Sequence, residues 1–264
     1  FKSKKKNKLK FYINDLTHKD SLNNFKDIDY VIHLASMTNA ASSFKRKNEM
    51  YRNNLKCMKN IINFCIKNKV KLIHISSTSV YGKQADLVDE NCEKRYLQPQ
   101  SPYADIKLLE EKMLKKISKK IKYTTFRFGT ISGISSGMRF HTAVNKFCLN
   151  ASLNLPITVY KTALNQYRPY LSLKDAFKVF KFTIEKDLFK NQIYNALSEN
   201  CTVKQIIDKI KIFKKNIKIK FVYSEIMNQL SYHVSKDKLN KEGLKLNNKI
   251  KFDIKDTLNL LKNI

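Results

Sequence analysis

Three polar residues, Ser77, Tyr103 and Lys107, have the chemical types and the spacing of a proton-transfer set. Tyr103 and Lys107 are four residues apart in a segment with helical periodicity, so their side chains lie on one face of the predicted helix. A free tyrosine has a pKa of about 10, and a nearby positive charge lowers that pKa towards the range of a general base. Ser77 ends a predicted strand and could donate a hydrogen bond to the same substrate oxygen. Such a set would remove the proton of a hydroxyl group while the carbon that carries it is oxidised.

The alternative is that these residues are ordinary polar positions on a strand and a helix. A Tyr-x-x-x-Lys pair arises often by chance in a chain with 52 lysines and arginines. The order of the neighbouring segments favours chemistry, because a buried strand is followed by a serine cluster, the letters VYG, a loop, and then SPYADIK at the start of a helix. Each of these features is common by itself, and it is their order along the chain that favours a catalytic role for the three residues.

Hydrophobic periodicity predicts strands that alternate with helices around these residues. In the first half, strands are predicted over 9–15, 27–36, 70–77 and 122–129, and helices over 48–67 and 101–117. Ser101 and Pro102 are a typical helix start. Because neighbouring parallel strands need a helical crossover, the alternation predicts an α/β fold with a doubly wound parallel sheet.

The second half predicts a smaller α/β lobe. Its expected elements are a strand over 156–160 and helices over 141–153, from 175 onwards, and over 254–261. We expect this lobe to pack over the carboxyl ends of the strands, where open α/β sheets bind their ligands.

The net charge of +30 raises the question of a nucleic-acid partner. Only six of the basic residues are Arg, and Lys occurs together with Asn and Ile along the whole length, which indicates a codon bias rather than a binding surface. Clear helix-turn-helix, zinc-finger and RNA-recognition signatures are absent. The sequence therefore disfavours a nucleic-acid partner.

The cysteines and the hydropathy bear on three classes of protein: disulfide-linked, metal-binding and membrane proteins. Five cysteines are scattered without CxxC spacing, which predicts reduced thiols, no disulfide framework and no metal site. No apolar run approaches the roughly 20 residues of a membrane span, and the first residues do not resemble a secretory signal. We expect a cytoplasmic protein without a membrane partner.

Eight stretches follow one another in a familiar order. They are NDLT at 14–17, VIHLAS at 31–36, NLKCMKNIINFC at 54–65, SSTSVYG at 76–82, SPYADIK at 101–107, FRFGTISG at 126–133, QYRPYLSLKDA at 166–176 and YNALSENCTV at 194–203. On these stretches the chain resembles the extended short-chain dehydrogenase/reductase family, and within it the NAD-dependent nucleotide-sugar epimerase/dehydratase group, including UDP-glucose 4-epimerase-like members. The resemblance implies a Rossmann-like sheet.

The resemblance also implies roles for the proton-transfer set. Tyr103 would be the general base, Lys107 would lower its pKa and hold the nicotinamide ribose, and Ser77 would orient the sugar hydroxyl. On the cofactor side, Asp15 and Leu16 would border the adenine.

Three further positions belong to the expected cofactor trough. Ala35 and Ser36 would line the trough, and Asn54 would be a buried residue at the mouth of a helix, serving the scaffold or the cofactor. His33 precedes the trough, and we interpret it as a structural residue.

The expected substrate contacts include one departure from the family pattern. Arg168 matches an Arg that pairs with the nucleotide diphosphate, which suits its forked donors, although a surface Arg is the alternative. Thr130 falls where many epimerases place a substrate-contacting Asn. A second departure lies after Ser77, where dehydratases usually carry an Asp-Glu pair and this chain has Thr78 and Ser79. Elimination of water is therefore disfavoured.

The glycines mark the largest departure. All five lie at or after Gly82, so the glycine-rich turn that would hold the pyrophosphate is missing from this sequence. We expect an amino-terminally truncated chain, with a truncated dinucleotide-binding domain over 1–133, lacking its first βαβ portion, and a substrate-binding lobe over 134–264 interleaved with it. The strand that chooses between NAD and NADP is missing too, so NAD is expected and NADP stays open. As given, the chain is expected to bind the cofactor weakly and to be inactive.

The expected function of the complete protein is NAD-dependent epimerisation of a nucleotide-diphosphate sugar through a keto-sugar intermediate. Two alternatives stay open: a net nucleotide-sugar dehydrogenase or reductase, and a catalytically inactive module that binds sugar nucleotides or polyanions. The family's usual pairing through two long helices, here 48–67 and 102–120, implies a homodimer.

Overall fold

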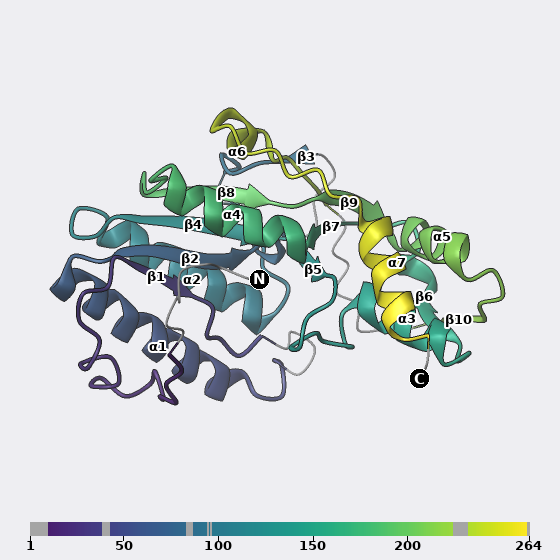
Figure 1. Ribbon diagram of the computed structural model, residues 1–264, viewed down its shortest axis with the longest axis horizontal. Helices are drawn as coiled ribbons and strands as arrows, with labels where there is room; N and C mark the ends of the chain where they lie inside the picture. Colours follow the sequence, from purple (N-terminus) through teal and green to yellow (C-terminus); the bar gives the residue numbers. More distant parts are fainter. Residues whose placement is uncertain are drawn as a thin grey trace, which may run out of the picture.

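A computed structural model gives the arrangement of residues 10–38, 43–82, 87–93, 95, 97–223 and 232–262 (Figure 1). Its centre is a sheet of four parallel strands in the order β1-β2-β4-β8. These strands are β1 (Tyr30–His33), β2 (Lys71–Ser77), β4 (Tyr123–Phe128) and β8 (Gln192–Ala196). Their carboxyl ends point towards the second lobe (Figure 1).

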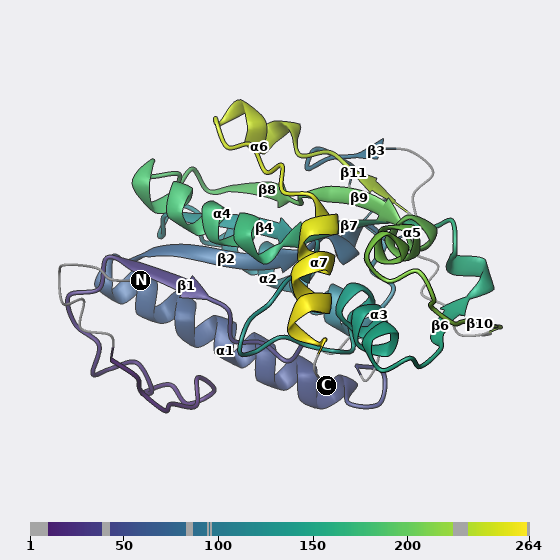
Figure 2. The ribbon, with the colours of Figure 1, turned by 45° about the vertical axis from the view of Figure 1, so that its right-hand side comes forward.

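Helices cover both faces of this sheet, as the doubly wound prediction requires. Helices α1 (Lys47–Asn68) and α2 (Pro102–Lys116) lie on one side, and α4 (Leu173–Glu185) lies on the other (Figures 1 and 2). Met58 and Leu114 pack on one face against β2, and Val179 packs on the other against Phe126. Burial of apolar area on both faces supplies the main stabilisation of the sheet.

The start of α2 follows from its sequence. The Ser101 side chain accepts a hydrogen bond from the Ala104 backbone N–H, and Pro102 occupies the first turn, where no helical N–H partner is needed. This cap fixes where the helix begins, and it places Tyr103 in the first turn, at the carboxyl end of β2.

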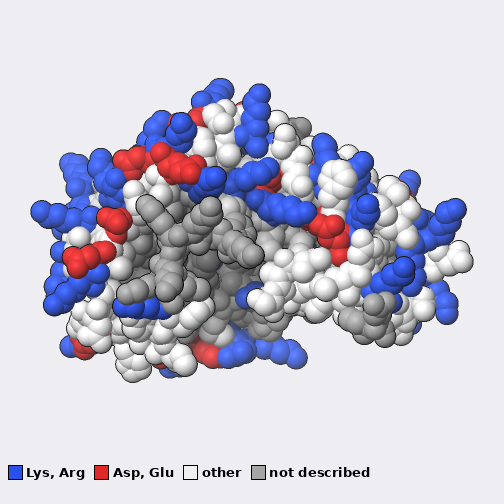
Figure 3. Space-filling view, in the orientation of Figure 1, with Lys and Arg blue, Asp and Glu red and all other residues white. Residues whose placement is uncertain are grey.

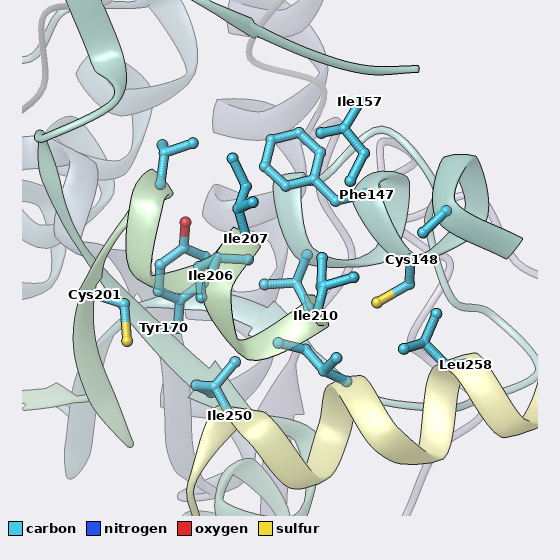
Figure 4. Close-up of a cluster of buried hydrophobic side chains, with 14 of the residues drawn as sticks. Phe147, Cys148, Ile157, Tyr170, Cys201, Ile206, Ile207, Ile210, Ile250 and Leu258 are labelled. Carbon is cyan, nitrogen blue, oxygen red and sulfur yellow. The ribbon is translucent and has the colours of Figure 1, made fainter. Parts of the chain in front are cut away.

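The second lobe has its own core (Figure 4). Its helices are α3 (Ala143–Ser152), α5 (Val203–Phe213) and α7 (Ile250–Leu260), and its two-stranded sheet pairs β6 (Ile157–Tyr160) with β10 (Ile219–Val222). Figure 4 shows Phe147, Ile207 and Ile210 converging between these helices, with Leu258 on α7 beside them.

Short elements join the lobe to the main sheet. A three-stranded sheet has the order β5-β7-β9, and β3 pairs with β11. The short elements are β5 (Thr130–Ser132), β7 (Tyr167–Ser172), β9 (Glu199–Thr202), β3 (Leu87–Val88), β11 (His233–Val234), α6 (Asp237–Lys241) and the 3-10 helix η1 (Thr78–Tyr81). Because β8 and α4 come late in the chain yet belong to the main sheet and its cover, the two halves of the sequence are interleaved in space.

A buried polar joint ties α7 to these short strands. The Asp253 carboxylate accepts hydrogen bonds from Ser132 Oγ at 2.7 Å and from Ser172 Oγ at 2.9 Å. Asn248 Nδ2 donates to Ser172 Oγ at 2.8 Å. Burial raises the pKa of the Asp253 carboxyl, and the two serine hydroxyls oppose that rise only in part.

One predicted strand was wrong. Within the described part of the expected strand over 9–15, residues 10–15 form no strand, and Phe11 and Ile13 are 86% and 104% exposed. A strand needs a hydrogen-bonded neighbour, and among the described residues β1 pairs only with β2. Two boundaries also moved: β1 covers only Tyr30–His33 of the predicted 27–36, and α7 begins at Ile250 rather than at 254.

Candidate active site

The carboxyl end of β2 places Ser77 at the start of η1. Its Oγ accepts hydrogen bonds from the Ser79 backbone N–H at 3.2 Å and from Ser79 Oγ at 2.9 Å. Because Oγ accepts these bonds, its own proton is free to point at a third group. Ser77 also contacts the Tyr103 hydroxyl, so two of the three predicted catalytic residues meet here.

Lys107 completes the predicted set from the next turn of α2. Its Nζ lies 5.9 Å from the centre of the Tyr103 ring. Lys107 is 4% exposed, whereas Tyr103 is half-buried. The structure therefore brings Ser77, Tyr103 and Lys107 together.

The electrostatics of Tyr103 differ from the simplest expectation. Burial raises its pKa, and the Glu110 carboxylate raises it further. Together they outweigh the lowering by the Lys107 ammonium and, to a smaller extent, by Arg139 and the Ser77 hydroxyl. Lys107 thus lowers the pKa of Tyr103, as predicted. The pKa of the phenol without bound ligands is nevertheless raised above its usual value.

The ammonium is held by residues that the sequence reasoning missed. Lys107 Nζ donates to Glu110 Oε2 at 2.8 Å, and His74 Nε2 lies 2.9 Å from the same oxygen. Burial opposes the charge of Lys107, but Glu110 outweighs it and the pKa of Lys107 is raised. A carboxylate three residues after the lysine was a readable signal on a helix, whereas the contribution of His74 depends on how α2 packs on β2.

A separate ionic pair lies beside this one. The Glu111 carboxylate binds Arg127 in a bidentate pair at 2.9 and 2.7 Å and accepts a hydrogen bond from Ser76 Oγ at 2.6 Å. All three side chains are buried. Neighbouring glutamates on α2 therefore serve two different networks.

The expected trough residues follow β1. Ser36 is half-buried and Ala35 is exposed. Asn54 is buried, and its amide fixes this segment, because Oδ1 accepts from Met37 N at 2.9 Å and Nδ2 donates to Met37 O at 3.1 Å. These bonds fit the scaffold interpretation of Asn54.

Asp15 and Leu16 lie beside α1. The Leu16 carbonyl accepts a hydrogen bond from Asn60 Nδ2 at 2.8 Å, and its side chain packs against the core under α1. The exposed Asp15 carboxylate accepts a hydrogen bond from the Thr17 backbone at 2.8 Å. His33 is buried, and burial lowers its pKa to about 4, so the imidazole is neutral at pH 7.

A pocket of about 280 Å³ lies where the trough meets the second lobe. It is lined by Ser36, Met37, Thr38, Arg46, Met50, Arg139 and His141. The Arg139 backbone is held by Thr142 Oγ1 and Asn145 Nδ2, which donate to its carbonyl at 3.2 and 3.0 Å. Arg139 links this pocket to the phenol, because its charge acts to lower the pKa of Tyr103.

The predicted substrate residues lie on the short strands. Thr130 begins β5, opposite Tyr170 of β7, and Arg168 lies on β7 opposite Cys201. The charge of Arg168 acts on Tyr232, whose hydroxyl contacts Thr78 of η1. Arg168 and η1 therefore lie near the same tyrosine, and Thr130 follows the end of β4 by two residues.

Three further features bear on possible partners: the distribution of surface charge, the metal-ligating residue types and the length of the helices. On the face in Figure 3, Lys and Arg are dispersed with Asp and Glu between them, as on a solvated surface. Among the residues that the structure describes, no group of three or more His, Cys, Asp or Glu is placed to hold a metal ion. In that same part of the chain, no helix is long and apolar enough to cross a membrane.

A parallel α/β sheet with Ser, Tyr and Lys gathered at the carboxyl end of β2 defines a protein of the short-chain dehydrogenase/reductase type. The family model described as "NAD dependent epimerase/dehydratase family" matches residues 1–196, and the chain belongs to this family.

Two curated relatives are similar over long stretches. A dTDP-D-glucose 4,6-dehydratase of Dictyostelium discoideum is 27% identical over 203 residues, covering 71% of this chain and 46% of the relative. An ADP-L-glycero-D-manno-heptose-6-epimerase of Brachyspira hyodysenteriae is 24% identical over 234 residues, covering 84% of this chain and 72% of the relative. The chain thus spans less than half the length of the first relative.

The fold has solved counterparts. The UDP-glucose 4-epimerase of Bifidobacterium longum, in complex with NAD+ and UDP, superposes with a TM-score of 0.83 at 20% identity, covering 96% of this chain and 82% of that one. This likeness confirms the predicted fold class.

Proposed function

We propose that the protein is an NAD-dependent epimerase of a nucleotide-diphosphate sugar, acting through a keto-sugar intermediate. The observation that carries the proposal is the meeting of Ser77, Tyr103 and Lys107 beside a pocket at the carboxyl ends of the strands. Membership of an NAD-dependent family supports the cofactor, and the names of the two relatives, which act on a dTDP-linked and an ADP-linked sugar, support the substrate class.

The residues present fit the nicotinamide end of such a cofactor. Lys107 offers a buried ammonium for a ribose hydroxyl, and Ser36 offers a hydroxyl on the pocket wall, with Ala35 next to it. Asp15 and Leu16 would border the adenine. When bound, the nicotinamide accepts and returns a hydride; NADP could supply the same chemistry.

The chain's own residues would handle the proton. Ser77 would fix the sugar hydroxyl, and Tyr103 would take its proton and return it after the keto sugar has turned over. Because the proton and the hydride both come back, there is no net redox change. Arg168 would pair with the diphosphate, and Thr130 would contact the sugar.

The positions after Ser77 favour epimerisation over dehydration. Thr78 is buried and its hydroxyl donates to the Phe128 carbonyl at 3.3 Å, while Ser79 donates to Ser77. Neither offers a carboxylate that could supply the acid and base for loss of water. The two positions carry hydroxyl groups here, whereas the dehydratase pattern has two carboxyl groups.

The decisive experiment replaces the phenol. In the complete protein, Tyr103→Phe should lower the turnover of nucleotide sugars at millimolar NAD by about 10²–10⁴-fold, since a positioned general base contributes that much, while the rise in melting temperature with nucleotide sugar is retained. Tyr51→Phe is the matched control, because the Tyr51 hydroxyl binds Asp105 on α2 at 3.0 Å and plays no part in the proposed chemistry.

Near-normal turnover in Tyr103→Phe refutes the role of Tyr103 as the general base. Two further outcomes would favour the alternative functions. Steady accumulation of NADH would indicate a net dehydrogenase, or reductase in the reverse direction. Salt-sensitive RNA binding, with no effect of nucleotide sugars on melting, would indicate a polyanion-binding module.

Assembly and location follow from the same proposal. We propose a cytoplasmic homodimer in which α1 and α2 of two chains pack together, with the half-buried Leu55 and Leu109 among the apolar side chains available for the contact. Burial of such side chains would provide the driving force.

A further inference from the structure

A dry ionic cluster lies beneath the candidate active site. It consists of Lys107 and Glu110 on α2, His74 on β2 and Thr125 on β4, all at most 4% exposed. Lys107 Nζ and His74 Nε2 meet the same Glu110 oxygen, Oε2, at 2.8 and 2.9 Å. His74 Nδ1 lies 3.2 Å from Thr125 Oγ1.

Each ring nitrogen of His74 has one polar neighbour. Nε2 donates to the Glu110 carboxylate, and Nδ1 meets the Thr125 hydroxyl, which can donate or accept. The other carboxylate oxygen, Glu110 Oε1, is buried and has no hydrogen-bond partner within the described part of the chain. The carboxylate is therefore held through Oε2, where Lys107 and His74 both bind it and lower its pKa against the effect of burial.

Other ionisable groups face this carboxylate without touching it. They are Tyr103 on α2, His33 on β1 and Cys57 on α1, and the charge of the carboxylate acts to raise the pKa of each. His33 is neutral at pH 7 and the Cys57 thiol has a raised pKa, so neither supplies a charge there. Glu110 is thus the contacting counter-charge for Lys107, with Glu111 acting on it only from a distance.

A buried ammonium without a counter-charge sheds its proton, because desolvation penalises the charged form. We propose that Glu110, fixed by His74, is a positioning residue that keeps Lys107 protonated at its buried site and thereby holds down the proton affinity of Tyr103. The catalytic consequence rests on the proposed function, whereas the effect on the phenol does not.

The test measures Tyr103 directly. Tyrosine labelled with 13C at Cζ gives a titration curve for each phenol, and the Tyr103 signal is the one lost in Tyr103→Phe. Glu110→Gln removes two opposing influences on Tyr103: the repulsion of the phenolate by the Glu110 carboxylate, and the charge that this carboxylate keeps on Lys107. Because the Lys107 charge acts more strongly on the phenol than the Glu110 charge does, the Tyr103 midpoint should move to higher pH, by up to about one unit. Glu110→Asp, which keeps the charge, should stay close to wild type.

Glu111→Gln is the matched control. Glu111 is the next residue and equally buried, but its partner is Arg127, which stays charged at all relevant pH values. This control should lose stability without moving the Tyr103 midpoint. In a Lys107→Met background, Glu110→Gln should no longer raise the midpoint.

The remaining outcomes decide against the proposal. A folded Glu110→Gln variant whose Tyr103 midpoint is unchanged or lower overturns it. If that variant does not fold, the test is made on the wild-type protein, in which the Lys107 13Cε signal is assigned by its loss in Lys107→Met. This signal should titrate at higher pH than those of the surface lysines. Titration at lower pH than the surface lysines overturns the proposal. Failure to turn over any nucleotide sugar would refute the proposed function and leave these titrations standing.

Discussion

Two buried carboxylates, Glu110 under the candidate site and Asp253 in the joint to the second lobe, have opposite electrostatic environments. The partners of Asp253 are the neutral hydroxyls of Ser132 and Ser172 and the neutral amide of Asn248, and burial raises its pKa. Burial acts on Glu110 in the same direction, but Lys107 and His74 together outweigh it and the pKa is lowered. The comparison teaches that burial alone does not set the charge of a carboxylate, because an ammonium and a ring N–H that bind it reverse the outcome.

The largest expected effect comes from removing that ammonium. Lys107→Met leaves the Glu110 carboxylate buried without a counter-charge and should lower the free energy of unfolding by about 3–5 kcal/mol near neutral pH. Because the folded pKa of Glu110 is lowered, the wild-type pair stabilises the protein above the unfolded value of 4.5 and loses that contribution as the pH falls through the folded pKa. The cost of the substitution should therefore shrink in acid.

Urea unfolding at neutral and acidic pH measures this cost. Lys112→Met, on the exposed face of the same helix, is the control and should change stability by no more than about 0.5 kcal/mol. Equal losses in the two variants would show that the buried pair has no special weight, and the contrast between the two carboxylates would fail.

A smaller effect, with the opposite pH trend, is expected at the joint. Since the folded pKa of Asp253 is raised, this carboxyl stabilises the fold below its unfolded value of 3.8, and that contribution is lost as the pH rises through the folded pKa. Asp253→Asn should therefore cost about 1 kcal/mol near neutral pH and more in acid. Asp256→Asn, 42% exposed on α7, is the control for unfolding curves at both pH values. A cost that grows towards neutral pH would contradict the assignment.

The smallest expected effect lies at the mouth of the pocket. Arg139→Gln should raise the titration midpoint of Tyr103 by a few tenths of a pH unit, because the guanidinium is exposed and screened by solvent. Arg46→Gln is the control, since that guanidinium is bound to Glu49. An Arg139 effect as large as that of Glu110→Gln would mean that the mouth, rather than the buried cluster, governs the phenol.

Local sequence signals predicted the parts of the site that lie close together in the chain. The Ser101-Pro102 start and the four-residue spacing from Tyr103 to Lys107 were enough to place both side chains on one helical face. The pair of His74 and Glu110 could not be predicted in this way, because it forms only when α2 packs across β2. A strand over 9–15 was wrong for a related reason: propensity supplies no hydrogen-bonded neighbour.

The second lobe shows the same limit. Thr202 and Gln205 form a capping box that starts α5, and this local signal is not among those from which the predicted helices were drawn. The joint at Asp253 depends on serines from two strands more than 80 residues earlier in the chain, and periodicity contains no information about such a meeting.

The late position of β8 has a consequence for synthesis. During translation, the outer edge of β4 stays without its partner while the ribosome makes α3, β6 and β7, because β8 follows all of them. The parallel sheet thus closes through contacts that are distant in sequence, which is a slow kind of folding event. A chain released before β8 would expose the edge of β4 to other chains, so the nascent protein would need a chaperone most during this interval.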